Sequence, residues 1–236
     1  NKMRSILTML GIIIGVAAVI ALVSIGNGVK QDIQNSISSL GSNLLMVMPG
    51  APRTPGVRPS AGSMKSLKVS DYEAISKLDG VKAASPMTNG SYVVIYQNKN
   101  WTTSVSGVSY NYLDVNNWSM KSGRFLSEKN VQNRERVAVV GKTVVKNLFG
   151  DEDPVGAEIR VKNIPFRIIG VLNSKGSGAM GNDQDDMVII PYTTAMERVE
   201  GVDYLRMIYV TGKDENGIDR LQSDIENLLR VRHGIK

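Results

Sequence analysis

The stretch LTMLGIIIGVAAVIALVSIGNG covers residues 7–28 and decides how the chain is organised. It belongs to a longer segment, Ser5 to Val29, without any charged side chain. A bilayer crossing needs about 20 apolar residues, whereas a signal-peptide core needs roughly 7–15. The apolar run from Ile6 to Ile25 meets the longer requirement and ends without a small-x-small cleavage site. We therefore predict a transmembrane helix over residues 1–28; a cleavable signal is the alternative.

Basic residues at the start of the chain predict its orientation. Lys2 and Arg4 precede the apolar run. The positive-inside rule then places a short N-terminal segment in the cytoplasm. We expect a single span in the cell (inner or cytoplasmic) membrane, with the main domain periplasmic or extracellular.

Small residues follow one stripe of this helix. Gly11 and Gly15 are four apart, and Ala18 and Leu22 fall near the same stripe at 100° per residue. Small residues at this spacing let another helix approach closely in lipid. We predict helix packing at Gly11, Gly15 and Ala18. The alternative is a plain anchor, because Gly and Ala are common in membrane helices.

An amphipathic helix is expected to continue outward as a stalk over residues 29–43. Its apolar residues recur at spacings of three or four, which gives one apolar face. Gly41 is well placed as its C-cap. A stalk of this kind can transmit motion between the membrane and the domain; a stalk that only packs on its own domain is the alternative. The predicted stalk residues are Val29, Ile33, Ile37 and Leu40.

The remaining composition is that of an ordinary folded body. The 236 residues are 42% hydrophobic, which is enough for one core or two small ones. The net charge is +6, but Lys and Arg are scattered and no basic run is interleaved with aromatic residues, which argues against a nucleic-acid partner. The absence of cysteine excludes disulfides and thiolate metal sites.

The pattern of the body is α+β, with a β-rich middle between two flanks that contain both helices and strands. Ser70 and Glu73 read as a capping box at the start of the first of these helices. The last helix carries an apolar stripe from Ile218 to Leu229. The expected strands are 44–48, 81–87, 91–97, 102–109, 136–141, a hairpin over 157–173 that turns near Asn163, 186–191 and 206–212; the expected helices are 70–80, 142–150, 192–201 and 214–232.

Gly141, Lys142 and Thr143 stand between a predicted strand and a predicted helix, as in a phosphate-binding loop. That loop needs another glycine five residues before Gly141, so that backbone amides can surround the phosphate. Arg136 occupies the position, and a β-branched strand follows it. We predict no nucleotide site here.

The sequence GSGAMG, residues 176–181, repeats the glycine spacing of a dinucleotide-binding turn. Such a site needs a helix to begin at the glycines. A strand follows instead, so we predict a flexible hairpin tip.

Three acidic residues in the same loop suggest a calcium site, but the spacing is wrong. An EF-hand loop that starts at Asp183 needs glycine and glutamate where the chain has Val188 and Thr194. We interpret Asp183, Asp185 and Asp186 as a solvated acidic loop.

The chain has a single histidine, His233, at the end of the last predicted helix, where a cation is favourable. Without a second histidine or a G-x-S-x-G segment, the familiar hydrolytic and zinc sites are not expected. We predict no catalytic residue, no cofactor-binding residue and no metal ligand, so the chain is not expected to be an enzyme.

Several segments together resemble MacB-type ABC transporter permeases, over nearly the whole chain and in order. The resemblance begins with KMRSILTMLGIIIGVAAVIALVSIGNG, residues 2–28, which is similar to the first membrane helix of that family. It continues through LGSNLLMVMPG, SGRFL, VAVVG, LFGDEDPVG, FRIIGVL and VIIPYTTA.

The resemblance implies a fold and a division into domains. It implies a Porter-like α/β subdomain over residues 44–107 and 204–233, with an inserted β-rich Sabre-like subdomain over residues 108–203. It also implies that the chain is a fragment, with a further span expected after its last helix.

The resemblance implies a function as well. The chain would couple cytoplasmic ATP hydrolysis to extracytoplasmic movement, a mechanotransmission that exports or extrudes a substrate. The implied partners are an ABC ATPase subunit or domain, a second permease copy, an adaptor (membrane-fusion) protein and the membrane. The alternative is a single-span extracytoplasmic sensor or binding domain without an ATPase.

Overall fold

The computed structural model describes residues 9, 11, 14–20, 22–24, 26, 43–50, 65–178, 182–214 and 217–234, which separate into two compact units, residues 1–40 and 41–236. In the first unit, the described residues are helical. Among the described residues, no helix is both long enough and apolar enough to cross a membrane. The transmembrane helix over residues 1–28 therefore stays a prediction, and the stalk residues Val29, Ile33, Ile37 and Leu40 lie outside the described residues.

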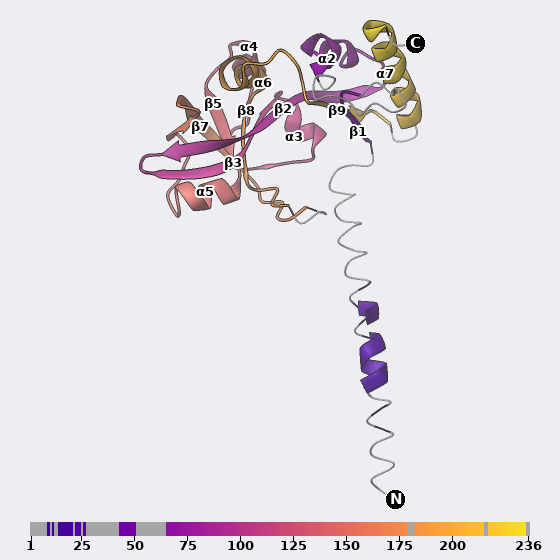
Figure 1. Cartoon of the computed structure of the whole chain (residues 1–236), viewed down its shortest axis with the longest axis vertical. Coiled ribbons are helices and arrows are strands. Elements are labelled where there is room, and N and C mark those ends of the chain that lie inside the picture. The colour runs from indigo at the N-terminus through magenta and orange to yellow at the C-terminus, as the bar shows by residue number, and fades with distance from the viewer. Residues whose placement is uncertain are drawn as a thin grey trace, which may run out of the picture. The chain divides into compact units, whose positions relative to one another are not determined.

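The second unit contains a nine-stranded mixed sheet among its described residues (Figure 1). The spatial order is β1-β9-β2-β3-β8-β5-β7-β4, and β6 pairs with β2 and β7. The pairs β3–β8 and β5–β7 are parallel, and the others are antiparallel. The strands are β1 (Leu44–Val47), β2 (Val81–Tyr96), β3 (Lys99–Val108), β4 (Met120–Gly123), β5 (Val137–Val140), β6 (Glu158–Val161), β7 (Ile164–Leu172), β8 (Met187–Pro191) and β9 (Met207–Gly212).

Strand β2 is the longest element of the sheet and is shared by its two halves. Its 16 residues span about 50 Å at the usual rise of a strand. Residues 81–87 pair with β9, and residues 87–96 pair with β3. The sheet is therefore continuous between the part that holds β1 and β9 and the part that holds β5, β7 and β8.

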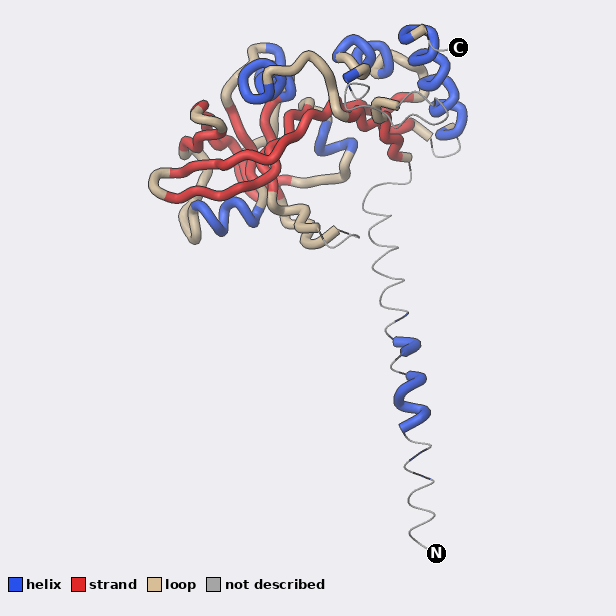
Figure 2. The backbone as a smooth tube through the Cα atoms, viewed as in Figure 1, coloured by secondary structure: helices blue, strands red, loops and turns tan. Residues whose placement is uncertain are grey.

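Helices lie on both sides of this sheet (Figure 2). Helix α5 follows β5 and has Val144 and Leu148 fully buried. Helix α7 begins at Ile218 and buries Leu221 and Ile225. The helical segments are α2 (Val69–Ile75), α3 (Tyr112–Val115), α4 (Glu128–Gln132), α5 (Lys142–Leu148), α6 (Tyr192–Thr194), the π-helical segment η2 (Ala195–Glu200) and α7 (Ile218–His233).

Three clusters of buried apolar side chains form the core. The first includes Leu148 and Phe166 and lies where α5 meets the sheet. The second joins α2 and α7 to β9 through Ile75 and Ile208, and the third surrounds Leu172 near α3 and β4. The Porter-like and Sabre-like subdivision stays a prediction, because one sheet runs through both predicted parts.

Most predicted elements are confirmed, but α3, β4 and α4 were not predicted, and three of the predicted features differ. The capping box of α2 does not use Ser70 and Glu73: the helix follows Lys68, whose backbone N–H donates to the Asp71 carboxylate. Strands predicted over 81–87 and 91–97 are the single strand β2. The helix predicted over 192–201 is α6 followed by the π-helical segment η2.

Candidate functional site

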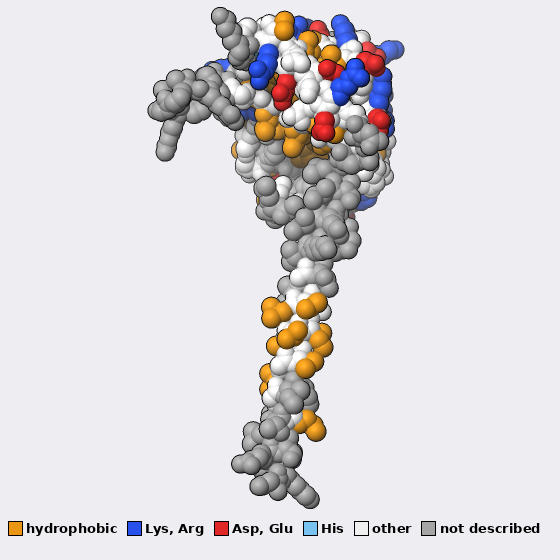
Figure 3. All heavy atoms as spheres, turned by 90° about the vertical axis from the view of Figure 1, so that its right-hand side faces the viewer, with side chains coloured by type: hydrophobic (Ala, Val, Ile, Leu, Met, Phe, Trp, Pro, Cys, Tyr) orange, Lys and Arg blue, Asp and Glu red, His pale blue; other side chains and the backbone are white. Residues whose placement is uncertain are grey.

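The predicted helix-packing residues Gly11, Gly15 and Ala18 lie in the helical part of the first unit and are exposed. A Cβ atom added at Gly11 or Gly15 would meet nothing within 4 Å. Figure 3 shows that the described side chains around this helix are mostly hydrophobic. Seven of them are 53–70% exposed: Met9, Ile14, Val16, Val19, Ile20, Leu22 and Val23. A helix that is apolar all round needs an apolar environment.

Two backbone amides of the segment Gly141, Lys142 and Thr143, which follows β5, donate hydrogen bonds to other parts of the protein. The N–H of Gly141 donates to the carbonyl of Met187 at 2.9 Å, and the N–H of Thr143 donates to the carbonyl of Asp185 at 3.2 Å. The Thr143 hydroxyl donates to the carboxylate of Asp183 at 2.6 Å. Two amides that would face a phosphate in a nucleotide loop are therefore already bound, and an anionic side chain stands next to them.

The described residues on either side of the glycine-rich segment pair as the two arms of a hairpin, as predicted, and residues 179–181 lie outside the described residues. Residues Ser177 and Asp183 form an antiparallel bridge, and the N–H of Gln184 donates to the carbonyl of Gly176 at 3.0 Å. Strand β7 precedes this tip and β8 follows it.

The interpretation of the acidic loop as solvated is wrong for Asp185, which is 4% exposed. Its carboxylate accepts hydrogen bonds from the Ser174 hydroxyl and from the N–H groups of Lys175 and Gly176. Asp186 accepts a hydrogen bond from the indole N–H of Trp101 at 2.8 Å. Asp185 therefore joins the two arms of the loop, and Asp186 joins the loop to β3, because buried polar atoms need such partners.

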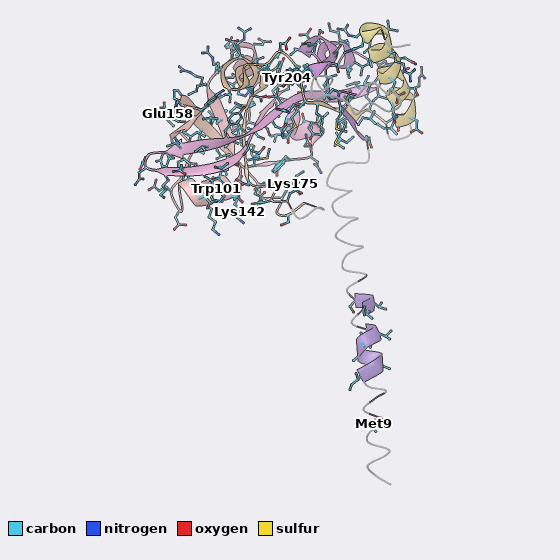
Figure 4. The ribbon with its side chains drawn as sticks, viewed as in Figure 1. Met9, Trp101, Lys142, Glu158, Lys175 and Tyr204 are labelled. Atoms are coloured by element: carbon cyan, nitrogen blue, oxygen red, sulfur yellow. The ribbon has the colours of Figure 1, made fainter. Side chains whose placement is uncertain are left out.

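Lys175 (Figure 4) lies in the loop that follows β7 and contacts an aromatic side chain. The ammonium of Lys175 lies 4.7 Å from the centre of the Trp118 ring and donates to the carbonyl of Asn116 at 2.6 Å. Burial lowers the pKa of Lys175. Its contacts are internal and explain its position without a ligand. Among the residues that are described, no group of three His, Asp or Glu side chains is arranged to hold a metal ion.

A buried carboxylate joins α2 to the last turn of α7. The side chain of Asp71 is 3% exposed. Arg232 donates from Nε to Oδ1 at 2.8 Å, and the N–H of Lys68 donates to Oδ2 at 2.9 Å. Nε2 of His233 lies 3.0 Å from the same Oδ2. Because a carboxylate only accepts, this imidazole nitrogen carries the hydrogen. We call Asp71, Arg232 and His233 the α2–α7 clamp.

The electrostatics of the clamp favour an ionised Asp71. Burial by itself raises the pKa of this carboxyl group. The hydrogen bonds from Arg232, from the Lys68 amide and from His233 act in the opposite direction, and the net effect is a lowered pKa. A carboxylate that accepts two or three such bonds is stabilised in its charged form.

The sequence interpretation placed His233 correctly at the end of the last helix but missed its partner. Asp71 lies 162 positions before His233, so only the tertiary fold brings them together. One signal was present: Asp71 precedes the buried Ile75 by four residues, which puts a carboxylate on the buried face of α2. A charge on that face calls for a partner.

Comparisons with known proteins agree with this fold. The macrolide export ATP-binding/permease protein MacB of Rhodospirillum rubrum is 44% identical over 236 residues, which is 99% of this chain and 36% of that protein. The protein of the same name from Marinobacter nauticus is 39% identical, over 100% of this chain and 36% of its own length. The chain therefore spans about a third of the length of the curated relatives it matches.

Solved structures show the same architecture. The periplasmic region of MacB from Actinobacillus actinomycetemcomitans has a TM-score of 0.71 and 26% identity, and the match covers 84% of this chain and 87% of that one. The extracellular domain of the ABC-type transporter YknZ from Gram-positive bacteria has a TM-score of 0.68 at 18% identity, over 82% and 96% of the two chains, which shows a common fold.

The body of the chain is thus a mixed α/β domain with the fold of a MacB periplasmic region. The model of the MacB-like periplasmic core domain family matches residues 5–228. This match covers nearly the whole sequence, and the chain belongs to the MacB-like periplasmic core domain family.

Proposed function

We propose that this chain is part of the permease of a MacB-like ABC transporter and couples cytoplasmic ATP hydrolysis to movement of its extracytoplasmic domain. The movement exports or extrudes a substrate. The family match carries the proposal, together with the names of the relatives, which are macrolide export ATP-binding/permease proteins.

The chain acts mechanically in this proposal, and ATP is hydrolysed in a separate domain or subunit. The bonded amides of Gly141 and Thr143 support a non-catalytic role for the segment that most resembles a nucleotide loop. The partners are an ABC ATPase, a second permease copy, an adaptor protein and the membrane, in which residues 1–28 form one span.

The connections of the sheet support a mechanical role. Strand β1, which follows the proposed stalk, pairs with β9, and β9 pairs with residues 81–87 of β2. Helix α7 packs on the same half through Leu221 and Ile225. A displacement of either segment would reach the far half of the sheet along β2, because hydrogen-bonded strands move together.

The experiment breaks the stalk in the full-length transporter. Ile33→Gly with Ile37→Gly costs roughly 1 kcal/mol of helix stability per site and removes two apolar side chains. We expect ATP hydrolysis to persist while export, measured as resistance to the exported compound, falls. The matched control, Gln34→Ala with Ser38→Ala, should change neither.

Membrane insertion of both variants is checked first, because loss of the protein would also lower resistance. If the glycine pair leaves hydrolysis and export at the level of the unmodified transporter, the stalk is only a tether and the mechanical proposal is wrong.

A further inference from the structure

The apolar packing of α7 weakens toward its C-terminal end. Leu221 and Ile225 are 3% exposed, Leu228 and Leu229 are partly buried, and Val231 is 82% exposed. Apolar contacts therefore hold the first three turns of the helix, and the last turn needs another attachment to stay in place.

The α2–α7 clamp supplies that attachment. Arg232 and His233 are consecutive residues in the last turn, and both reach the buried carboxylate of Asp71. Their own side chains are 35% and 21% exposed, so both are partly shielded from solvent. Removing one partner of a buried ion pair leaves an uncompensated charge, which makes such a contact costly to break.

Asp71 is also held by the start of α2 itself. It lies in the first turn of α2, and its Oδ2 accepts from the backbone of Lys68. The ammonium of Lys68 in turn pairs with Asp203 at 2.6 Å, in the loop that leads to β9. Polar contacts thus run from the end of α7 through α2 to the segment before β9.

We propose that the α2–α7 clamp is a coupling latch, in which Asp71 joins the last turn of α7 and the first turn of α2 into one rigid piece. A pull on the C-terminal end of α7 then moves the half of the sheet that contains β9 and does not unwind the helix. This inference rests on the proposed mechanical function. Asp71 is a positioning residue here, because it acts through α7.

The test measures local opening and coupling in the same full-length transporter. Asp71→Asn keeps the size of the side chain and removes its charge. We expect amide hydrogen exchange in residues 230–234 to become about tenfold faster or more, while exchange in β2 and β9 stays unchanged. Export should fall while ATP hydrolysis persists. Arg232→Gln, which alters a partly exposed side chain and leaves Asp71 in place, should give the same pattern.

The matched control is Asp224→Asn. Asp224 lies on the same helix and faces Arg220 at 4.0 Å in an exposed pair, so its loss should change neither exchange nor export. If Asp71→Asn also speeds amide hydrogen exchange throughout β2, its effect is not local. The opening of the last turn of α7 is then judged from Arg232→Gln alone.

The outcomes separate this inference from the proposed function. Unchanged exchange in the last turn for Arg232→Gln contradicts the latch. The latch is also wrong if the last turn opens and export stays normal, while the glycine pair in the stalk abolishes export. If neither the opened latch nor the broken stalk affects export, the mechanical function itself is wrong.

Discussion

Gly141 lies so close to the carbonyl oxygen of Asp185 that a Cβ atom at residue 141 would stand 2.1 Å from that oxygen. The same backbone segment accepts hydrogen bonds from Gly141 and Thr143 through Met187 and Asp185. Glycine is therefore required at position 141, between β5 and α5, because two backbone segments approach closely there. This approach is a structural reason for a motif that resembles a phosphate loop.

Substituting this glycine should destabilise the fold. Gly141→Ala forces backbone against backbone, so we expect the free energy of unfolding to fall by about 1–3 kcal/mol or more, measured by urea denaturation. Gly50→Ala is the control, because a Cβ at residue 50 meets nothing within 4 Å. Equal stability of the two variants would mean that the approach at Gly141 is looser than described.

The clamp should make stability depend on acid pH. The pKa of Asp71 is lowered in the fold, because the hydrogen bonds from Arg232 and His233, with that of the Lys68 amide, outweigh burial. Its contribution is therefore present above the pKa of the unfolded chain, about 3.9, and is lost as the pH falls through the folded pKa. Asp71→Asn should be less stable than the natural chain near pH 7, and the difference should shrink toward about pH 2.

Thermal unfolding of both chains across this range checks the expectation, with Asp224→Asn as a control from an exposed pair. A difference that stays constant with pH would show that the Asp71 charge does not contribute.

Glu200 should show the opposite dependence. Burial raises its pKa, although the Thr88 hydroxyl donates to it and Arg206 is nearby. A raised carboxyl pKa stabilises the fold fully below the unfolded pKa, and that contribution is lost as the pH rises through the folded value. Glu200→Gln still accepts from Thr88 and avoids burying a charge. We expect it to raise the melting temperature at about pH 8 and to change it little near pH 4.

The control for Glu200 is Glu197→Gln in the same helical segment. Glu197 pairs with Arg134 at 2.8 Å, and both side chains are half exposed or more. Loss of this pair should change the melting temperature little, because solvent screens exposed ion pairs. A melting temperature that falls for Glu200→Gln at both pH values would contradict a raised pKa of Glu200.

Substitution of Gly11 and Gly15 by leucine tests whether this helix packs against another helix of the transporter. Among the described residues, a Cβ atom at Gly11 or Gly15 has no neighbour within 4 Å. An effect of leucine at both positions would therefore favour contacts with other helices of the assembled transporter. We expect weaker assembly in detergent, by roughly 1–2 kcal/mol. Normal assembly and export would favour a plain anchor.

Local patterns were enough to predict much of the fold. The β-branched run VAVV became β5, within the strand predicted over 136–141, and α5 lies within the helix predicted over 142–150. The turn near Asn163 is confirmed by positive φ angles at Lys162 and Asn163, which Asn tolerates better than most residues. These features depend on neighbours in the sequence, so the sequence alone reveals them.

Features that depend on distant segments were not predictable in this way. Nothing near Asp185 in the sequence indicates that it is buried, because the partners of its carboxylate come from the other arm of the loop, after β7. The clamp depends on Asp71 and Arg232 meeting across 161 positions. The continuity of β2 was missed because Thr88, Asn89 and Gly90 read as a break, whereas the neighbouring strand β3 pairs through all three.

The shared strand β2 also limits how these domains can be recombined. Val94, in the second half of that strand, belongs to the core around Phe166, whereas Ala84, in the first half, belongs to the core around Ile75. A graft that exchanged one core between two relatives would therefore have to join two half-strands from different parents. A chimera that joins two relatives at loops would preserve the contacts of each core only if all of β2 came from one parent. Both cores must therefore come from the same parent.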